Sequence, residues 1–301
     1  MIDFRVIYLP QNVGHGEARR LCLNECRYPL VALMDADDIS CFYRFEKQLE
    51  VFDAKPYLSV VGGQIIEFDN DSKQYTGIRH VPLNHSEIKK YMKKRCPMNQ
   101  VSVMFKVNDV IDAGGYIDWY CEEDYYLWIR MIEKGFLFEN IPDITVKVRT
   151  GEAMSSRRGG WKYFSSEMRL QKYMLEEKII SKIRYIFNVL IRFFGEVLVG
   201  TSLRKKLFRF MRKSVSKDLV TNLDSNMAPT YKKNSHSESF SVSMCVYKGD
   251  NPEWFDLALS SIINQSIQPR EIVVVADGPL TDSLEAVVKK YKDICVSLNV
   301  E

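Results

Sequence analysis

The sequence predicts an α/β protein with a mostly parallel, doubly wound sheet, and two observations support this. Apolar stretches of strand length alternate with helical segments at both ends of the chain, in residues 2–38 and 240–301. This alternating order is typical of a parallel sheet with helices on both faces. Two of the strands also end on acids, Asp35 and Asp277, and such sheets bind ligands at the carboxyl ends of their strands.

The composition is that of a globular protein and limits the possible classes. The chain has 301 residues, enough for one large domain, and its net charge of +3 gives no general argument for nucleic acid as a partner. Seven cysteines without paired or metal-ligand spacing predict reduced thiols and a cytoplasmic protein. We expect neither a signal peptide nor a transmembrane helix, because no apolar run reaches about 18 residues.

The first part of the chain contains most of the expected elements. Helices are predicted where apolar residues recur every three or four positions, as at Phe45, Leu49 and Phe52. Strands are predicted where apolar residues run together between turn residues. The expected strands are 4–9, 29–34, 58–68, 101–105, 136–139 and 144–148, and the expected helices are 17–26, 44–52, 86–94, 107–113 and 124–134.

The pattern changes after Trp161. A helix is expected over 162–177, and residues 178–217 then hold eleven Lys or Arg and a single acid, Glu196, among apolar residues. A basic amphipathic segment is typical of a helix on an anionic membrane surface, although it can also pack on its own domain. Residues 218–239 are polar and predict a linker. The last elements are expected to be strands at 240–247 and 271–276 and helices at 252–265 and 280–292.

The run from Val31 to Asp38 is the most informative local feature. An apolar strand ends on three carboxylates, Asp35, Asp37 and Asp38, and burying neighbouring charges is unfavourable without a cation. Acids two residues apart suit Mg²⁺ or Mn²⁺ with positions left open for phosphate oxygens. The alternative is that all three acids only cap and close the following turn.

Five segments stand out when the chain is read from residue 240 to 301 and then from 2 to about 164. They are SVSMCVYKGDN (241–251), SIINQSIQPREIVVVADG (261–278), NVGHGEARR (12–20), LVALMDADD (30–38) and EEDYYLWIRMIEKG (122–135). In this order they resemble the family-2 inverting glycosyltransferases of GT-A fold. The usual opening strand then comes last, which indicates a circular permutation. The alternative is a fragment that joins the tail of one transferase unit to the head of the next.

The resemblance implies a division of the chain into four parts. Residues 1–165 would hold the metal, donor and acceptor sites, and residues 240–301 would be the nucleotide-binding half of the same GT-A domain. Between them lie a basic helical segment, 166–217, and a linker, 218–239.

The resemblance also implies roles for four acids. Asp37 would be the main metal ligand, Asp35 would lie near both the metal and the donor ribose, and Asp277 would bind the uracil base. Asp124 would be the general base that takes a proton from the acceptor hydroxyl. Acids also occur at helix N-termini for dipole reasons, and Asp before Gly is a common turn residue.

Further candidates have an ordinary structural explanation beside the functional one. Tyr247, Arg19, Arg157 and Arg158 are expected to bind the donor, the two last from a basic loop that would otherwise be solvated. Glu123 and Trp128 are expected to bind the acceptor. A cap residue and a core tryptophan are the alternatives.

These observations predict a metal-dependent inverting glycosyltransferase. It would move a hexose from a nucleotide-diphosphate sugar, expected to be a UDP-sugar, to a hydroxyl of a polysaccharide or lipid-linked oligosaccharide. Its expected location is the cytoplasmic face of the plasma membrane. An inert nucleotide-sugar-binding or membrane-associated scaffold is the alternative. A nucleotidyltransferase ranks last, because residues 248–250 make a poor Gly-rich loop.

Overall fold

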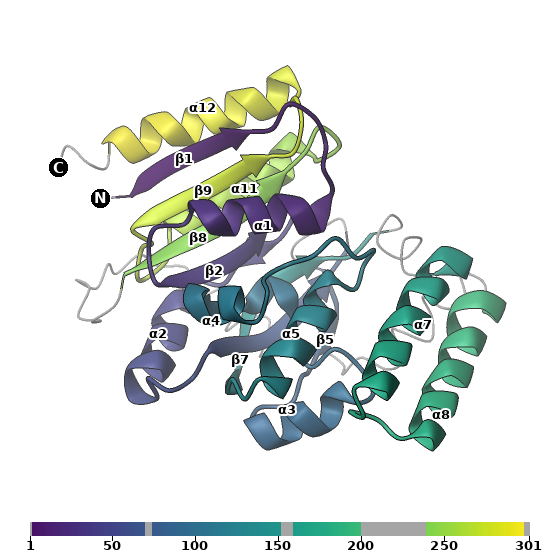
Figure 1. The fold of residues 1–301 in the computed structure, drawn as a ribbon. Coiled ribbons are helices and arrows are strands. Elements are labelled where there is room, and N and C mark those ends of the chain that lie inside the picture. Colours follow the sequence, from purple (N-terminus) through teal and green to yellow (C-terminus); the bar gives the residue numbers. More distant parts are fainter. Residues whose placement is uncertain (1, 70–73, 152–158, 200–238, 298–301) are drawn as a thin grey trace.

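A nine-stranded mixed sheet forms the centre of the molecule (Figure 1). The structure is a computed structural model that describes residues 2–69, 74–151, 159–199 and 239–297. In sheet order the strands are β1 (Asp3–Tyr8), β9 (Glu271–Ala276), β8 (Phe240–Val246), β2 (Leu30–Asp35), β6 (Met104–Lys106), β4 (Val60–Phe68), β7 (Phe138–Arg149) and β3 (Ile39–Ser40), with β5 (Tyr75–Arg79) beside β4.

The two ends of the chain interleave in this sheet. Strands β8 and β9 lie between β1 and β2, and all four are parallel. Tyr8 and Val246 both pair with Ala276, so the carboxyl ends of β1, β8 and β9 are level, and Asp35 pairs with Cys245. The expectation that both ends build one sheet is confirmed. Asp35 and Asp277 therefore lie at the same edge of the sheet.

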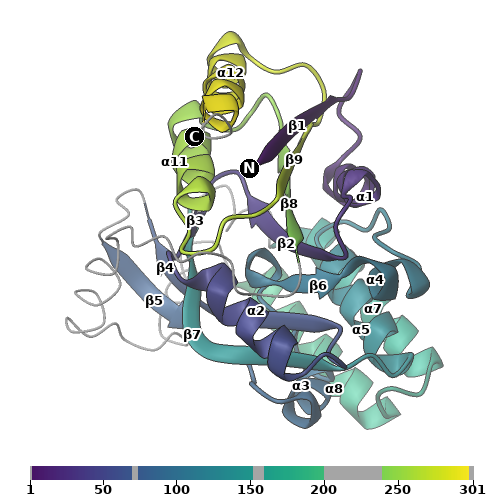
Figure 2. The same cartoon turned by 90° about the vertical axis from the view of Figure 1, so that its left-hand side faces the viewer.

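Helices cover both faces of the sheet, as expected for a doubly wound fold (Figure 2). Alternate residues of β2 and β9 point to opposite faces, as the two-residue period of a strand requires. One core packs against α2 (Arg44–Ala54), α11 (Pro252–Ile263) and α12 (Asp282–Ser297). The other face packs against α1 (His15–Glu25), α3 (His85–Met92), α4 (Val107–Asp112), α5 (Glu123–Glu133) and α7 (Gly160–Glu176).

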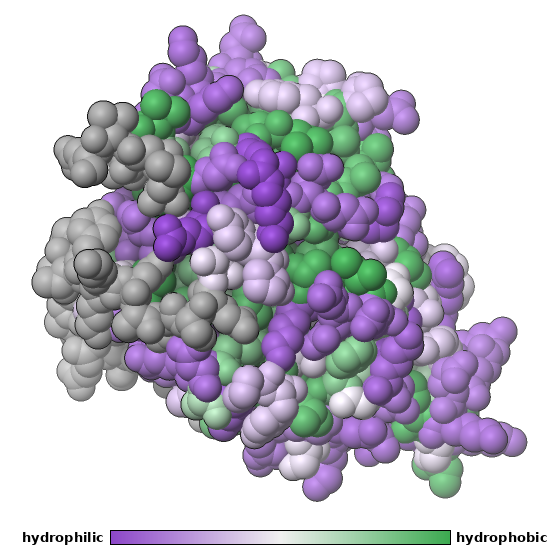
Figure 3. Space-filling model, turned by 60° about the vertical axis from the view of Figure 1, so that its left-hand side comes forward, coloured by the Kyte–Doolittle hydropathy of each residue, from purple (hydrophilic) through white to green (hydrophobic). Residues whose placement is uncertain are grey.

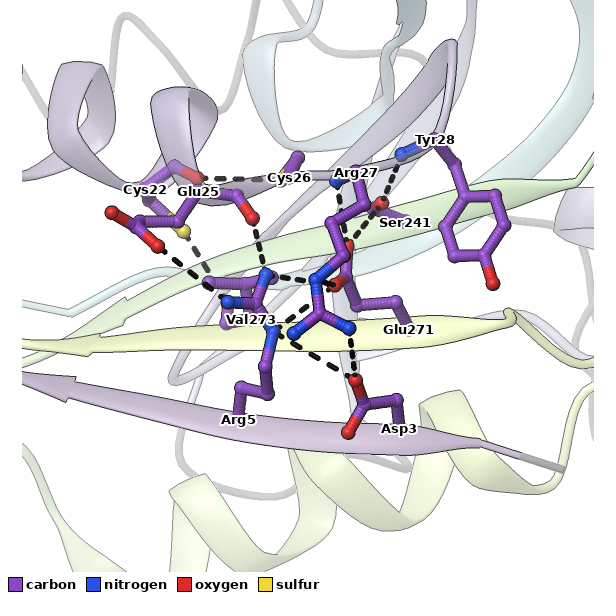
Figure 4. Close-up of polar contacts among 10 residues, drawn as sticks. All are labelled: Asp3, Arg5, Cys22, Glu25, Cys26, Arg27, Tyr28, Ser241, Glu271 and Val273. Carbon is purple, nitrogen blue, oxygen red and sulfur yellow. Dashed lines mark hydrogen bonds and ion pairs between the residues drawn. The ribbon is translucent and has the colours of Figure 1, made fainter.

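A polar network ties the two ends together at the amino ends of the strands (Figure 4). Its centre is the fully buried carboxylate of Glu271 on β9. Glu271 accepts hydrogen bonds from Arg5 Nη2 at 2.7 Å, from the Arg27 backbone N–H at 3.0 Å and from Ser241 Oγ at 2.7 Å. Arg27 also pairs with Asp3 at 2.8 Å. The early and late segments therefore complete each other's polar contacts.

Four strands differ from the sequence prediction. The expected strand 101–105 begins as a 3-10 turn, η1 (Gln100–Ser102), and only β6 pairs in the sheet. The two strands expected over 136–148 are one long strand, β7, whose register with β4 is irregular at Gly62–Ile65. Strands β3 and β5 were not expected.

The segment after residue 160 forms a helical hairpin at one side of the molecule. It contains α7, then α8 (Lys182–Arg192), which continues into the π-helical turn η2 (Phe193–Leu198). The predicted linker lies outside the described residues except at residue 239. Among the helices that the structure describes, none is both long and apolar enough to cross a membrane.

All seven cysteines lie in the described part of the chain, and none forms a disulfide. Three of them, Cys22, Cys295 and the half-buried Cys245, line helix–sheet contacts. On the face shown in Figure 3, hydrophilic residues predominate and hydrophobic residues form separate groups between them.

Candidate active site

A pocket opens at the level carboxyl ends of β8 and β9. Its volume is about 350 Å³. Asp277, directly after β9, accepts hydrogen bonds from the Val13 backbone N–H at 2.7 Å and from Asn12 Nδ2 at 2.9 Å. The lining residues are Asn12, Tyr247, Lys248, Asp277, Gly278 and Pro279.

Gly278 lets two strand connections meet at this pocket. Its φ is +88°, in the left-handed region that favours glycine. A Cβ at this position would lie 2.9 Å from the backbone N of Asn12. The turn after β9 and the segment after β1 can therefore approach closely only with glycine here, and this approach allows Asn12 to reach Asp277.

Tyr247 lies at the rim of the same pocket, as the sequence predicted for a residue beside the donor. Its side chain is 45% exposed, and its backbone N–H donates to Asp250 Oδ2 at 2.9 Å. An exposed phenol ring beside a pocket offers a face on which a planar group can stack.

Arg19 joins the acid strand end to the helix that carries the predicted base. From α1, its Nη2 contacts Asp35 Oδ1 at 2.8 Å and its Nη1 contacts Glu123 Oε1 at 3.0 Å. The Arg19 side chain is only 7% exposed. The sequence predicted direct contact with the donor. Two of the five guanidinium N–H groups bind the two carboxylates, so Arg19 also acts as a positioning residue for these acids.

Asp124 lies in the first turn of α5, at the end of the helix held by Arg19. Its Oδ1 accepts a hydrogen bond from the Tyr125 backbone N–H at 2.7 Å, and the Cys96 thiol lies 4.0 Å from its Oδ2. The preceding residue, Glu123, is predominantly buried and paired with Arg19. The structure thus brings Asp35, Arg19, Glu123 and Asp124 into one neighbourhood.

Burial and mutual repulsion change the pKa values of the acids on α5. Burial, with the charge of Asp124, raises the pKa of Glu123 to about 7 against the opposing effect of Arg19. Burial raises the pKa of Glu122 well above its usual range, helped by the charges of Glu167 and Asp124. Burial alone would lower the pKa of Arg19, but Asp35 and Glu123 raise it, so the guanidinium stays charged.

Asp35, at the end of β2, and the two acids that follow it have different surroundings. Asp38 is buried, and its Oδ1 accepts a hydrogen bond from the Arg149 backbone N–H at 2.8 Å. Burial and the nearby charges of Asp37 and Asp35 raise the pKa of Asp38 well above its usual range. Asp35 and Asp37 are half-buried. Asp38 therefore bonds to β7 across the sheet, a contact that the turn alternative did not predict, and Asp35 and Asp37 remain the candidates for a cation.

The donor chemistry of Asp35 and Asp37 fits Mg²⁺ or Mn²⁺, which prefer carboxylate oxygens. Within the part of the chain that the structure describes, no group of three or more His, Cys, Asp or Glu could hold a metal ion. Two carboxylates are enough only if the substrate supplies further oxygens. A phosphate-bearing substrate meets that requirement, and its negative charge needs a counter-ion.

Trp128 corrects the sequence prediction of an acceptor-stacking residue. Its side chain has no exposed surface and packs against Phe105 and Phe138. Because its indole face is covered on the inner side of α5, it belongs to the core. Arg157 and Arg158 lie outside the described residues.

Sequence reasoning missed two residues that order the site. Asn12 anchors Asp277, and Arg149 binds both acids after Asp35, donating from Nε to the Asp37 carbonyl at 3.2 Å. The Arg149 guanidinium also lies 4.2 Å from the ring of Trp254 and 4.6 Å from that of Phe68. An arginine at a strand end was the available clue, but its partners come from distant parts of the chain.

Comparison with known proteins decides the family. The family model for glycosyl transferase family 2 matches residues 2–113. A glycosyltransferase of Haemophilus influenzae is 40% identical over 213 residues, which cover 70% of this chain and 79% of that protein. The chain belongs to glycosyltransferase family 2. Its mixed, helix-flanked sheet is the GT-A fold of this glycosyltransferase.

Two further relatives of this family-2 glycosyltransferase have more specific names. An amylovoran biosynthesis glycosyltransferase of Erwinia amylovora is 36% identical over 192 residues, covering 64% of this chain and 71% of the relative. A UDP-Gal:alpha-D-GlcNAc-diphosphoundecaprenol beta-1,3-galactosyltransferase of Escherichia coli is 33% identical over 208 residues, covering 69% and 75%. By their names, the first acts in amylovoran biosynthesis and the second transfers galactose from UDP-Gal to alpha-D-GlcNAc-diphosphoundecaprenol.

Proposed function

We propose that this glycosyltransferase moves a hexose from a UDP-sugar to a hydroxyl of a lipid-linked oligosaccharide or growing polysaccharide, with inversion at the anomeric carbon. The observation that carries the proposal is the double ion pair of Arg19. It holds the acid strand end at Asp35 beside the helix end at Glu123 and Asp124. Candidate donor and acceptor groups therefore meet at one edge of the sheet.

The donor nucleotide would occupy the pocket between Tyr247 and Asp277. Asp277 already accepts two hydrogen bonds, and a carboxylate can accept about four. A further N–H, such as that of uracil, can therefore bind there, with the ring beside Tyr247. The Escherichia coli relative carries a UDP-sugar in its name, which supports the same donor class.

Asp124 would act as the general base. Its carboxylate would take the proton of the acceptor hydroxyl while that oxygen attacks the anomeric carbon and the nucleoside diphosphate leaves. Asp35 and Asp37 would hold Mg²⁺ or Mn²⁺. A bound ion would supply positive charge to the leaving diphosphate.

The test is a donor screen by mass spectrometry against UDP-, GDP- and TDP-sugars. Asp124→Asn is expected to bind UDP with Mn²⁺ as the wild type does, while transfer falls by about 10²–10⁴-fold. Asp37→Ala is expected to show no transfer, whether or not metal is added. Wild-type transfer by Asp124→Asn would reject the base. UDP binding without transfer or hydrolysis in the wild type would favour the inert scaffold.

We also propose that the chain order is a circular permutation of the family's usual order, with 240–301 as the nucleotide-binding half and 1–165 as the remainder. Support comes from β8 and β9, which fill the middle of a sheet begun by β1 and β2. A rearranged gene with residues 240–301 placed before residue 2 is expected to give a monomer with unchanged UDP affinity. An exchanged dimer of the original chain would favour the two-unit fragment instead.

Finally, we propose that the enzyme works at the cytoplasmic face of the plasma membrane. Reduced cysteines and a nucleotide-sugar donor are both consistent with the cytoplasm. The Escherichia coli relative has an undecaprenol-linked acceptor in its name, which supports a substrate held in the membrane. Fractionation of cells that produce the protein is expected to recover it with membranes.

A further inference from the structure

Helix α8 is built with its polar and apolar sides reversed relative to an ordinary surface helix. Its buried side carries polar residues: Asn188 donates to the Lys93 carbonyl at 3.0 Å and to Gln171 Oε1 at 2.8 Å. Arg192 pairs with Glu167 and donates to the Lys94 carbonyl. A surface helix in water normally turns its apolar stripe inward.

The opposite side of α8 is a continuous apolar stripe. Ile183 is 80% exposed, and the other members are each about half exposed. Their spacing of three and four residues places them on one helix face, because a turn takes 3.6 residues. We call this set the outer apolar face of α8; it consists of Ile183, Ile186, Phe187, Leu190, Ile191 and Phe194.

Positive charge borders this face on α8 itself. The Arg184 guanidinium lies 5.8 Å from the ring of Phe187, a member of the outer apolar face. Lys182, directly before Ile183, is exposed. In Figure 1, α8 lies at the edge of the molecule on the outer side of α7. The helix therefore presents positive charge together with the apolar stripe.

We propose that the outer apolar face of α8 docks in the plane of an anionic lipid surface. Large aliphatic and aromatic side chains on an amphipathic helix enter the boundary between headgroups and acyl chains, and neighbouring Lys and Arg bind anionic headgroups. Hydrophobic area as large as this is rare on a soluble monomer unless it has a partner. A second protein copy would satisfy the apolar stripe but would gain nothing from the basic residues.

The inner side of α8, opposite the docking face, contacts the loop that follows α3 through the carbonyls of Lys93 and Lys94. This loop continues directly to Cys96, whose thiol lies 4.0 Å from Asp124. Helix α8 is therefore on the α5 side of the site, and a membrane at its outer face would lie beyond that side. This orientation rests on the proposed function, whereas lipid binding itself does not.

The test is co-sedimentation of the full chain with vesicles of phosphatidylglycerol and phosphatidylcholine. The double variant Ile183→Ser, Phe187→Ser is expected to lose about tenfold or more of the vesicle affinity, since two apolar side chains no longer insert. The matched control, Ile111→Ser with Leu257→Ser, changes two similarly exposed residues on α4 and α11 and is expected to bind as the wild type does.

The charge contribution has its own arm. Lys182→Gln with Arg184→Gln leaves the apolar stripe in place and is expected to weaken binding to the anionic vesicles. Binding to pure phosphatidylcholine is expected to change little. Failure of the wild type to bind anionic vesicles would overturn the proposal, as would a dimer that the Ile183 and Phe187 substitutions dissociate. No sugar donor enters this experiment, so its failure is separate from a failure of glycosyl transfer.

Discussion

Single residues set the donor pocket, and Gly278 is the most restrictive of them. Gly278→Ala would place an Ala at φ +88° with its Cβ 2.9 Å from Asn12 N. We expect the free energy of unfolding to fall by about 2 kcal/mol and UDP affinity to fall several-fold, because the contact of Asn12 with Asp277 must shift. Urea unfolding and calorimetric titration measure the two effects.

Gly135 provides the matched control for this substitution. Its φ is +92°, but a Cβ there would meet no atom within 4 Å. Gly135→Ala therefore introduces similar backbone strain away from the pocket. Some stability is lost, and UDP affinity is expected to stay unchanged. Equal UDP affinity in both variants would show that the close approach at Gly278 does not shape the pocket.

Glu123 should make stability depend on pH in a defined window. Its pKa is raised from 4.5 to about 7 by burial and by Asp124. Between these values the unfolded chain releases the proton and the folded chain keeps it, so stability present below pH 4.5 is lost as the pH rises toward 7. Between pH 4.5 and about 7, the unfolding free energy of the wild type is therefore expected to fall relative to that of Glu123→Gln. A pH-independent difference would contradict the raised pKa.

At the scale of elements, Arg19 holds α1, β2 and α5 together. Lysine keeps the charge, but its N–H groups all share one nitrogen on a flexible stem. It therefore lacks the two separate, fixed nitrogens that Arg19 directs to Asp35 and Glu123. Arg19→Lys is expected to reduce transfer more than tenfold and to lower the unfolding free energy by about 2 kcal/mol. Steady-state kinetics and urea unfolding measure these changes.

The adjacent residue on the same helix is the control. Arg20 pairs with Glu17 three residues away, and both side chains are well exposed. Such pairs contribute about 0–1 kcal/mol, so Arg20→Lys should leave both stability and transfer nearly unchanged. If the two variants behaved alike, Arg19 would not be a positioning residue.

The sequence predicted elements best where periodicity was strong. Strand β9 has the predicted boundaries, and α5 differs from its prediction by one residue at each end. Strand β6 was placed too early, because an apolar run does not show where a 3-10 turn ends. Trp128 has the same ambiguity, since helical spacing alone does not say which face is covered.

The site was predictable only in part, for a related reason. Acids at strand ends are visible in a sequence because they interrupt apolar runs, and the structure does bring Asp35 and Glu123 together. The partner that joins them is not visible, since Arg19 lies 104 residues from Glu123 along the chain. The same holds for Arg149 beside Asp38, which only tertiary packing brings together.

At the scale of the whole molecule, the sheet has ionic contacts at both ends of its strands. The carboxyl ends form the candidate site, and the amino ends form the network around Glu271 (Figure 4). Arg5 and Arg27 come from the early segment, whereas Glu271 and Ser241 come from the late one. The network therefore couples the stability of the two segments.

Glu271→Gln tests that coupling. The variant leaves Arg5 beside a buried neutral amide, and breaking a buried ion pair costs about 3–5 kcal/mol. Asp3→Asn, which changes a half-exposed partner of Arg27, is expected to cost less than about 1 kcal/mol. Because one network spans both segments, hydrogen exchange in Glu271→Gln should lose protection in β1, β8 and β9 together. Loss confined to β8 and β9 would instead mean that the late segment unfolds independently of the rest of the sheet.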